Sequence, residues 1–131
     1  MKEPVWIDAR DALALHDRLL VLHGGAAGLR DEGLLESALA RPRQLLAYAD
    51  QADIVTLAAA YTAGMVRNHT FVDGNKRTGF VIGVLFLELN GCRFTAAEED
   101  ATQAILGLAA GTIEEPAFEQ WLGANTRRTR T

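Results

Sequence analysis

The feature that most restricts the fold is a pair of apolar segments, residues 54–66 and 80–89, joined by the polar residues 69–79. The first segment repeats apolar residues at i, i+3, i+4, i+7 and i+11 and follows Asp53, which indicates an amphipathic helix with an aspartate N-cap. The joining residues include a histidine, a carboxylate, an amide and two cations. Because loops held by a rigid scaffold commonly carry function, this pattern predicts a site where two helices meet.

The second apolar segment has apolar residues on every side of a helix. Val81 and Ile82 are β-branched and would also allow a strand. A run of ten or more residues without a turn signal, ended by Asn90 and Gly91, instead favours a helix. A helix that is apolar all round should be buried, so we predict that this segment forms the central helix of the fold.

The predicted N-terminus of that helix carries Gly74, Asn75, Lys76 and Arg77. The first backbone N–H groups of a helix lack intrahelical acceptors and the helix dipole is positive there, so this end can bind an anion. Lys76 and Arg77 add two positive charges, and Gly74 permits close approach. These residues predict a phosphate-binding site. They do not form a Walker A loop, because Lys76 lies between two glycines rather than after the second.

Asp73 and His69 add a second kind of chemistry beside this anion site. The carboxylate of Asp73 would repel a phosphate unless a cation lay between them, and Mg²⁺ commonly bridges carboxylate and phosphate oxygens. His69 can accept a proton near neutral pH. Together they indicate transfer of a phosphate-containing group to a hydroxyl, while Phe71 is interpreted as a core anchor. The alternative from composition alone is an ordinary helix N-terminus with solvated charges, capped by His69.

Two helices are predicted before residue 54. Asp8 is expected to cap one that runs to about His23, and Asp31 to cap a short one through Ala40. Pro42 is expected to end the second helix, because proline disfavours helical conformation in the residue before it. The connection at residues 24–30 contains three glycines but follows no strand, and is interpreted as a turn.

Two more helices are predicted after residue 91. Residues 92–94 are expected to be a short extended link, and a capping-box pattern at residues 95–98 opens a helix that ends at Gly111. Pro116 fits the first turn of a last helix, which Gly123 closes.

Three side chains outside the motif invite a functional interpretation. His16 and His23 are interpreted as surface or cap residues, because no ligand constellation surrounds them in the sequence. Arg67 could contact a phosphate or a target, or could be a favourable cation at a helix C-terminus, and we favour the latter.

The composition is that of a folded globular protein, with 49% hydrophobic and 23% charged residues among 131. We predict a single domain over residues 1–125, followed by a basic and flexible tail at 126–131 that contains Arg127, Arg128 and Arg130. The net charge of −4 and the pI near 5.3 give no general case for nucleic-acid binding.

The single cysteine, Cys92, excludes an internal disulfide and a cysteine-based zinc site. The chain opens without a cationic and apolar leader, and its longest apolar run, residues 80–87, is too short to cross a bilayer. We therefore expect a cytoplasmic protein that does not enter a membrane.

The sequence His-x-Phe-x-Asp-Gly-Asn-Lys-Arg at residues 69–77 resembles the signature H-x-F-x-[DE]-G-N-x-R of the Fic/Doc superfamily. Lys76 matches the Doc (death-on-curing) branch, whose members are toxins of toxin–antitoxin pairs. Residues 15–17 and 24–31 also resemble the N-terminal part of Doc proteins, so the resemblance covers nearly the whole chain. It implies a helical fold, in agreement with the all-α, compact bundle of about six helices and little or no β-structure that the predicted elements indicate.

The resemblance also bears on the reaction. Fic enzymes are best known for moving AMP from ATP to a protein hydroxyl, and their motif has Gly in place of Lys76 and a second Arg in place of Phe80. A lysine side chain would occupy part of the inner-phosphate pocket, and a phenylalanine cannot replace a bidentate phosphate contact. Doc toxins share both departures and are thought to bind the nucleotide in the opposite sense, as protein kinases. AMP transfer is the alternative.

Carried onto this chain, the resemblance implies that His69 accepts the proton of a Ser or Thr hydroxyl and that Asp73 holds Mg²⁺. The phosphates of ATP would be held by the Gly74 backbone, Asn75, Lys76 and Arg77. The implied target is elongation factor Tu, whose phosphorylation stops translation. A non-catalytic binding or regulatory module is a further alternative.

The resemblance implies two interaction surfaces. Fic/Doc proteins have an extended or hairpin-like segment before the motif that positions the target, and residues 41–51 are our candidate, with an irregular connector as the alternative. The expected partner is a Phd-like antitoxin, whose C-terminal segment folds as a helix into a groove on the toxin. Residues 41–51 and the first helix are candidates to line that groove.

Overall fold

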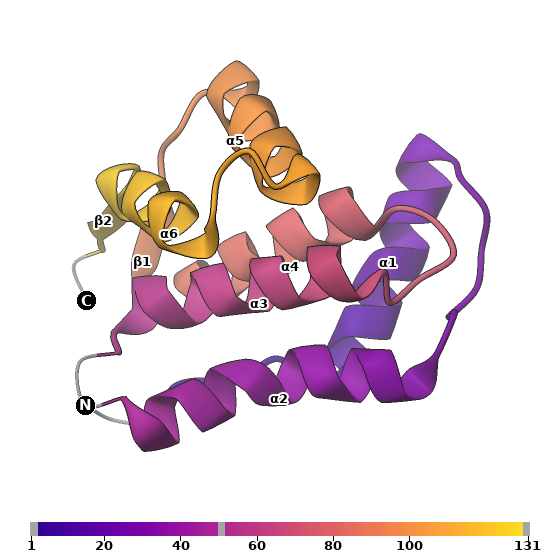
Figure 1. Cartoon of the computed structure of the whole chain (residues 1–131), viewed down its shortest axis with the longest axis horizontal. Coiled ribbons are helices and arrows are strands. Elements are labelled where there is room, and N and C mark those ends of the chain that lie inside the picture. Colours follow the sequence, from indigo (N-terminus) through magenta and orange to yellow (C-terminus); the bar gives the residue numbers. More distant parts are fainter. Residues whose placement is uncertain (1–2, 50–51, 130–131) are drawn as a thin grey trace.

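The chain folds into helices that pack around one central helix in the computed structural model, which describes residues 3–49 and 52–129 (Figure 1). The helices are α1 (Ala9–His23), α2 (Glu32–Tyr48), α3 (Ile54–Asn68), α4 (Asn75–Leu89), α5 (Glu98–Ala110) and α6 (Glu115–Ala124). Two short strands, β1 (Cys92–Phe94) and β2 (Thr126–Arg128), form an antiparallel pair. The predicted all-α fold of about six helices with little β-structure is confirmed. No helix in the described part of the chain combines the length and the apolar character needed to cross a membrane.

The central helix is α3 rather than α4. Every residue of α3 from 57 to 66 is buried, and Figure 1 shows α3 between α2 on one side and α5 and α6 on the other. The expectation that α4 would be the central helix is wrong, because its apolar residues Val81, Val84 and Leu85 are only half-buried and Leu89 is 46% exposed. The alanines and glycine of α3 explain the difference, since small side chains let neighbouring helices approach it from several sides.

The tightest helix contact joins α3 to α4. Gly79 and Gly83 of α4 face Thr62 of α3, whose hydroxyl donates a hydrogen bond of 2.8 Å to the carbonyl of Gly79. A Cβ atom on Gly83 would overlap that hydroxyl and lie 3.1 Å from the carbonyl oxygen of Ala58. At Gly79 and Gly83 the backbone of α4 therefore packs directly against α3, which fixes the end of α3 relative to the start of α4.

The predicted aspartate caps are confirmed. Asp8 accepts from the N–H of Asp11 in a reciprocal capping box, Asp31 accepts from the N–H of Gly33, and Asp53 from that of Thr56.

The predicted break at Pro42 is wrong, because α2 continues through this residue to Tyr48. Proline lacks the N–H that would bond to the carbonyl of Ala38. Pro42 is nevertheless buried, and Ala38 packs against Gly64 of α3, at 3.4 Å from the position of a Cβ there. Burial along this face offsets the lost hydrogen bond. Most of residues 41–51 is therefore helix; residues 50–51 lie outside the described part.

The C-terminal region differs from prediction at three points. Ala97, not Thr95, precedes α5, because the Thr95 hydroxyl donates to the carbonyl of Asn125 at 3.0 Å instead of capping the helix. Helix α6 continues past Gly123 to Ala124. Part of the predicted basic tail lies in β2, where Thr126, Arg127 and Arg128 pair with Phe94, Arg93 and Cys92. Arg130 lies outside the described residues.

The α3–α4 contact yields a stability prediction. Gly83→Ala should lower the free energy of unfolding by about 1–3 kcal/mol or more, because the added methyl group forces α4 away from Thr62. The measurement is urea unfolding followed by circular dichroism. Gly123→Ala in α6 is the matched control, since its Cβ meets only Val55 at an ordinary 3.5 Å and should stabilise by about 0.5 kcal/mol. Equal effects of the two substitutions would contradict the close contact.

Candidate active site

His69 is the C-cap of α3 and follows directly after Asn68, the last residue of that helix. Its backbone is left-handed, with φ 48° and ψ 53°, and it is the one non-glycine residue in the described ranges with a positive φ. This conformation is uncommon for residues other than glycine and costs free energy. It ends the helix abruptly and leaves the imidazole exposed at the edge of a cleft.

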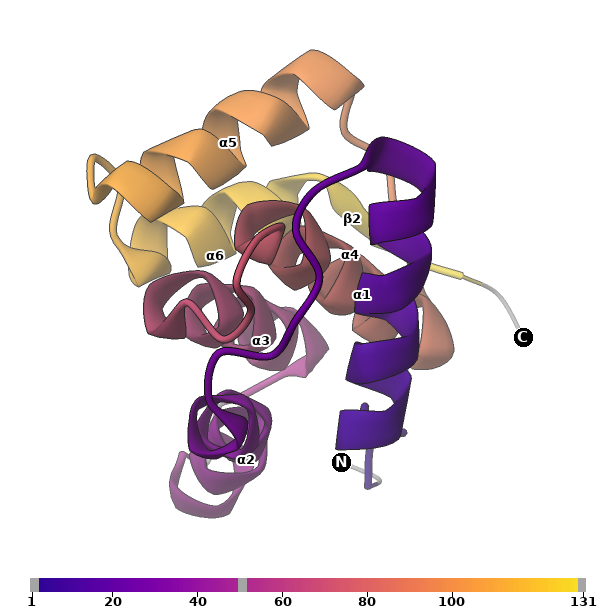
Figure 2. The same ribbon diagram turned by 90° about the vertical axis from the view of Figure 1, so that its right-hand side faces the viewer.

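The loop after His69 is held in shape by Asn75. The Asn75 side chain accepts a hydrogen bond of 2.8 Å from the Phe71 N–H and donates one of 2.9 Å to the Phe71 carbonyl. The Phe71 side chain is buried at 1% exposure, which confirms its interpretation as a core anchor. Residues 28–30 lie alongside in an antiparallel bridge, with Leu29 opposite Phe71. Figure 2 shows the connection from α1 to α2 running past the connection from α3 to α4. The loop is thus anchored from both sides.

The start of α4 presents free backbone donors. Gly74 is the N-cap with a left-handed φ of 79°, and no side chain caps the helix. The first helical hydrogen bond of α4 runs from the Thr78 N–H to the Gly74 carbonyl. Within the described residues, no acceptor pairs with the N–H groups of residues 75–77. Together with the exposed side chains of Lys76 and Arg77, these amides form a site suited to an anion.

Asp73 stands beside these amides as an ionised carboxylate. Its Oδ2 atom accepts from the Ala26 N–H at 3.2 Å, and its Oδ1 atom accepts from the Gly74 N–H at 2.8 Å. The Ala26 hydrogen bond, then the Gly74 hydrogen bond, hold the pKa of the Asp73 carboxyl below its usual range, and the charge of Arg77 acts in the same direction.

The residues of this cleft suit Mg²⁺ bound jointly by a carboxylate and substrate phosphates, rather than a metal ion bound by protein side chains alone. No group of three or more His, Cys, Asp or Glu side chains suited to a metal occurs in residues 3–49 and 52–129. Mg²⁺ is commonly bound by one or two carboxylates together with substrate phosphates and water. Asp73, next to an anion site, matches that pattern.

These groups line one cleft of about 890 Å³. That volume lies in the range of small-molecule sites, which is about 300–1,000 Å³. One wall is formed by the motif and the end of α1, and the other by α4 and α5. The α5 wall combines apolar and polar side chains, namely Glu98, Ala101, Thr102, Ile105, Leu106 and Ala109.

The structure brings most predicted site residues together. The cleft is lined by His69, Asp73, Gly74, Asn75, Lys76 and Arg77. The Asn75 side chain bonds to the backbone of Phe71 through its oxygen and one of its two N–H groups, and the backbone N–H of Asn75 has no acceptor among the described residues. Phe80, at the position of the second Arg of Fic enzymes, also lines the cleft and packs edge-on against Phe94 at 5.5 Å.

One residue was assigned to the wrong environment by sequence reasoning. His16 was interpreted as a surface or cap residue, but it is buried at 2% exposure and contacts the motif loop. Residues 24–30 were interpreted as a turn, and sequence reasoning did not find that the Ala26 N–H within that connection donates to the Asp73 carboxylate. The periodicity of α1 contained one signal for His16, because it lies four residues after the buried Ala12.

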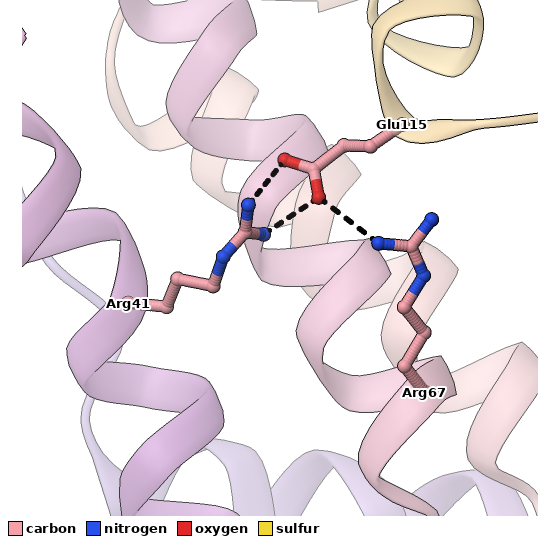
Figure 3. A network of polar contacts seen from close by, with 3 residues as sticks. All are labelled: Arg41, Arg67 and Glu115. Carbon is pink, nitrogen blue, oxygen red and sulfur yellow. Dashed lines mark hydrogen bonds and ion pairs between the residues drawn. The ribbon is translucent and has the colours of Figure 1, made fainter.

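Arg67 and residues 41–49 do not line the cleft, and residues 50–51 lie outside the described part of the chain. Figure 3 shows Arg41 and Arg67 on either side of Glu115. The distance from Glu115 Oε1 is 2.8 Å to Arg41 Nη1 and 3.5 Å to Arg67 Nη1. These ion pairs join α2, α3 and α6. Arg67 does lie in the last turn of α3, as predicted for a favourable cation, and it does not line the cleft.

The Asn75 hydrogen bonds yield a testable expectation. Asn75→Ala should lower the free energy of unfolding by about 1–3 kcal/mol, because it leaves both backbone groups of Phe71 without their partner. Asn125→Ala is the control, since that side chain donates only one hydrogen bond, to the Trp121 carbonyl at 2.8 Å, and should cost less. Chemical unfolding of both variants measures the difference; a smaller loss for Asn75→Ala would speak against its anchoring role.

Comparison with known proteins places the whole motif inside a family match. The sequence model of the Fic/DOC family matches residues 6–87, more than half of the chain. A curated relative named Protein kinase doc, from Escherichia phage P1, is 34% identical over 107 residues, which are 82% of this chain and 84% of the relative. Another, Toxin Doc from Mycolicibacterium smegmatis, is 36% identical over 100 residues, 76% of this chain and 74% of the relative.

Proposed function

This chain belongs to the Fic/Doc family, and we propose that it is a Doc-like toxin that transfers the γ-phosphate of ATP to a Ser or Thr hydroxyl of a protein. The observation that carries the proposal is the convergence of His69, Asp73 and the uncapped start of α4 on one cleft. Phosphoryl transfer needs mainly positioning and neutralisation of charge, and this cleft supplies both.

In the proposed reaction, the oxygen of the target hydroxyl attacks the γ-phosphorus of ATP. The bond from that phosphorus to the β–γ bridging oxygen breaks, and ADP leaves. His69 accepts the proton of the hydroxyl, because its ring is exposed at the edge of the cleft. The amides of residues 75–77, with Lys76 and Arg77, bind the phosphate oxygens. Mg²⁺ held by Asp73 would offset charge on the phosphates.

Two residues favour phosphate transfer over AMP transfer. Lys76 occupies the position that is Gly in Fic enzymes, and Phe80 occupies that of their second Arg. The cleft wall beside Phe80 is therefore apolar, with Phe94 behind it, and offers no bidentate contact to a further phosphate. The relative named Protein kinase doc supports the same reaction.

The proposed target and partner rest on the Doc resemblance. We take the target to be elongation factor Tu, whose phosphorylation would block translation. The proposed partner is a Phd-like antitoxin that binds as a helix, and α1 exposes apolar side chains suited to it, with Val21 at 85% and Leu22 at 63% exposure. Copurification with the product of the adjacent gene tests this partner directly.

Labelled ATP distinguishes the two reactions. With the purified protein, Mg²⁺ and elongation factor Tu, label at the γ-phosphate should transfer to the factor and label at the α-phosphate should not. His69→Ala should reduce this transfer by about 10²–10⁴-fold, because it removes the proton acceptor, and should leave ATP binding unchanged. Transfer of α label would instead establish AMP transfer. In cells that express the protein, growth arrest that persists with His69→Ala would favour a non-catalytic role.

Removal of the metal tests Asp73. Chelation by EDTA should stop transfer by the wild-type protein, and added Mg²⁺ should restore it. Asp73→Asn should raise the Mg²⁺ concentration that gives half-maximal transfer by at least about tenfold, the lower end of the effect found for outer-shell metal partners. Asp17→Asn, an exposed aspartate on α1, is the control and should behave as wild type. An unchanged Mg²⁺ requirement in Asp73→Asn would rule out Asp73 as the ligand.

A further inference from the structure

His16 is a buried polar residue of α1 that the reaction described above does not use. Its ring is 2% exposed, and within α1 only Ala12 and His16 are buried. His16 does not line the cleft. The ring instead reaches across from α1 to the loop that carries Phe71 and Asp73, 57 residues further along the chain. A polar side chain buried at this point calls for a specific partner.

The partner of His16 is the backbone of the motif. Its Nε2 atom lies 2.8 Å from the carbonyl oxygen of Asp73. A carbonyl oxygen can only accept, so Nε2 must carry the hydrogen. The imidazole also lies flat on the ring of Phe71, with centroids 3.7 Å apart and planes 6° from parallel. The His16 side chain thus contacts the loop at two positions, the Asp73 carbonyl and the Phe71 ring.

These contacts orient a single peptide unit. The carbonyl of Asp73 is bonded to His16, and the N–H of the same peptide, which belongs to Gly74, donates to Asp73 Oδ1 at 2.8 Å. With both polar groups of that peptide satisfied, its plane cannot rotate freely. That plane sets the direction in which the Asp73 carboxylate leaves the backbone and the direction in which α4 begins.

We propose that His16 is a positioning residue of the phosphate site, which aims the Asp73 carboxylate and the first amides of α4 by holding the Asp73–Gly74 peptide. The inference rests on the proposed function for its catalytic consequence, but its structural part can be tested without any activity. The hydrogen bond and the ring stacking make separate contributions, and two substitutions separate them. His16→Phe keeps a ring against Phe71 and removes the donor. His16→Gln restores an N–H donor and removes the ring.

The kinetic test compares these variants with wild type and with Asp17→Asn, an exposed neighbour on α1. We expect His16→Phe to remain folded and to lose about 10–100-fold in kcat/KM for ATP, the range found for residues that orient a metal ligand. His16→Gln should recover most of that loss, and Asp17→Asn should show none. A purely structural role would lower the melting temperature of His16→Phe and leave kcat/KM per folded molecule unchanged, which would overturn the proposal.

A second measurement stays valid if the protein proves not to transfer phosphate. Imidazole ¹⁵N shifts of the wild-type protein should show hydrogen on Nε2 of His16. The amide signals of residues 74–77 should move in His16→Phe and return toward wild type in His16→Gln, and binding of inorganic triphosphate, measured by calorimetry, should follow the same order. Hydrogen on Nδ1 alone, or unchanged amide signals in His16→Phe, would refute the positioning role whatever the enzyme assay shows.

Discussion

The close contact between α3 and α4 is the constraint on which the site depends. His69 caps the end of one of these helices and the uncapped amides of residues 75–77 begin the other, so their separation is set by how near the helices lie. Glycines at 79 and 83 remove the side chains that would hold the helices apart, and the hydroxyl of Thr62 bonds to the backbone of Gly79. The same contact contributes to the burial of α3 from residue 57 to 66, so the core and the candidate site share one support. A substitution that disturbs this contact would therefore affect both the stability of the fold and the geometry of the candidate site.

The electrostatics of the site are local rather than global. The chain has a net charge of −4, yet the start of α4 gathers two cations and several uncapped N–H groups in one cleft. Asp73 lies beside them as a carboxylate whose charge is stabilised by hydrogen bonds from Ala26 and Gly74. A phosphate chain would pair with the cations and amides at the start of α4, and a divalent cation would pair with the carboxylate of Asp73. The two together would complement both the positive and the negative charge of the cleft. Neither alone would suit this cleft as well.

The family match and the cleft do not have the same extent. The match ends at residue 87, and it contains every motif residue. The opposite wall of the cleft belongs to α5, which begins at Glu98 and lies beyond the match. The motif side of the cleft is therefore the part that the family model covers. The α5 wall, with Thr102 and Glu98 among apolar side chains, lies outside the matched residues.

The sequence by itself determined the helical class and the aspartate caps and proposed the residues of the candidate site, because each depends on residues close together in the chain. The motif at 69–77 could be recognised for that reason, and so could Phe71 as its anchor. Tertiary structure alone decided that α3 is central, that α2 continues through Pro42, and that His16 and Ala26 hold the motif loop. These outcomes depend on burial and on partners tens of residues away. Local propensity cannot contain that information, since the same histidine four residues after Ala12 would be solvent-exposed if no loop packed against it.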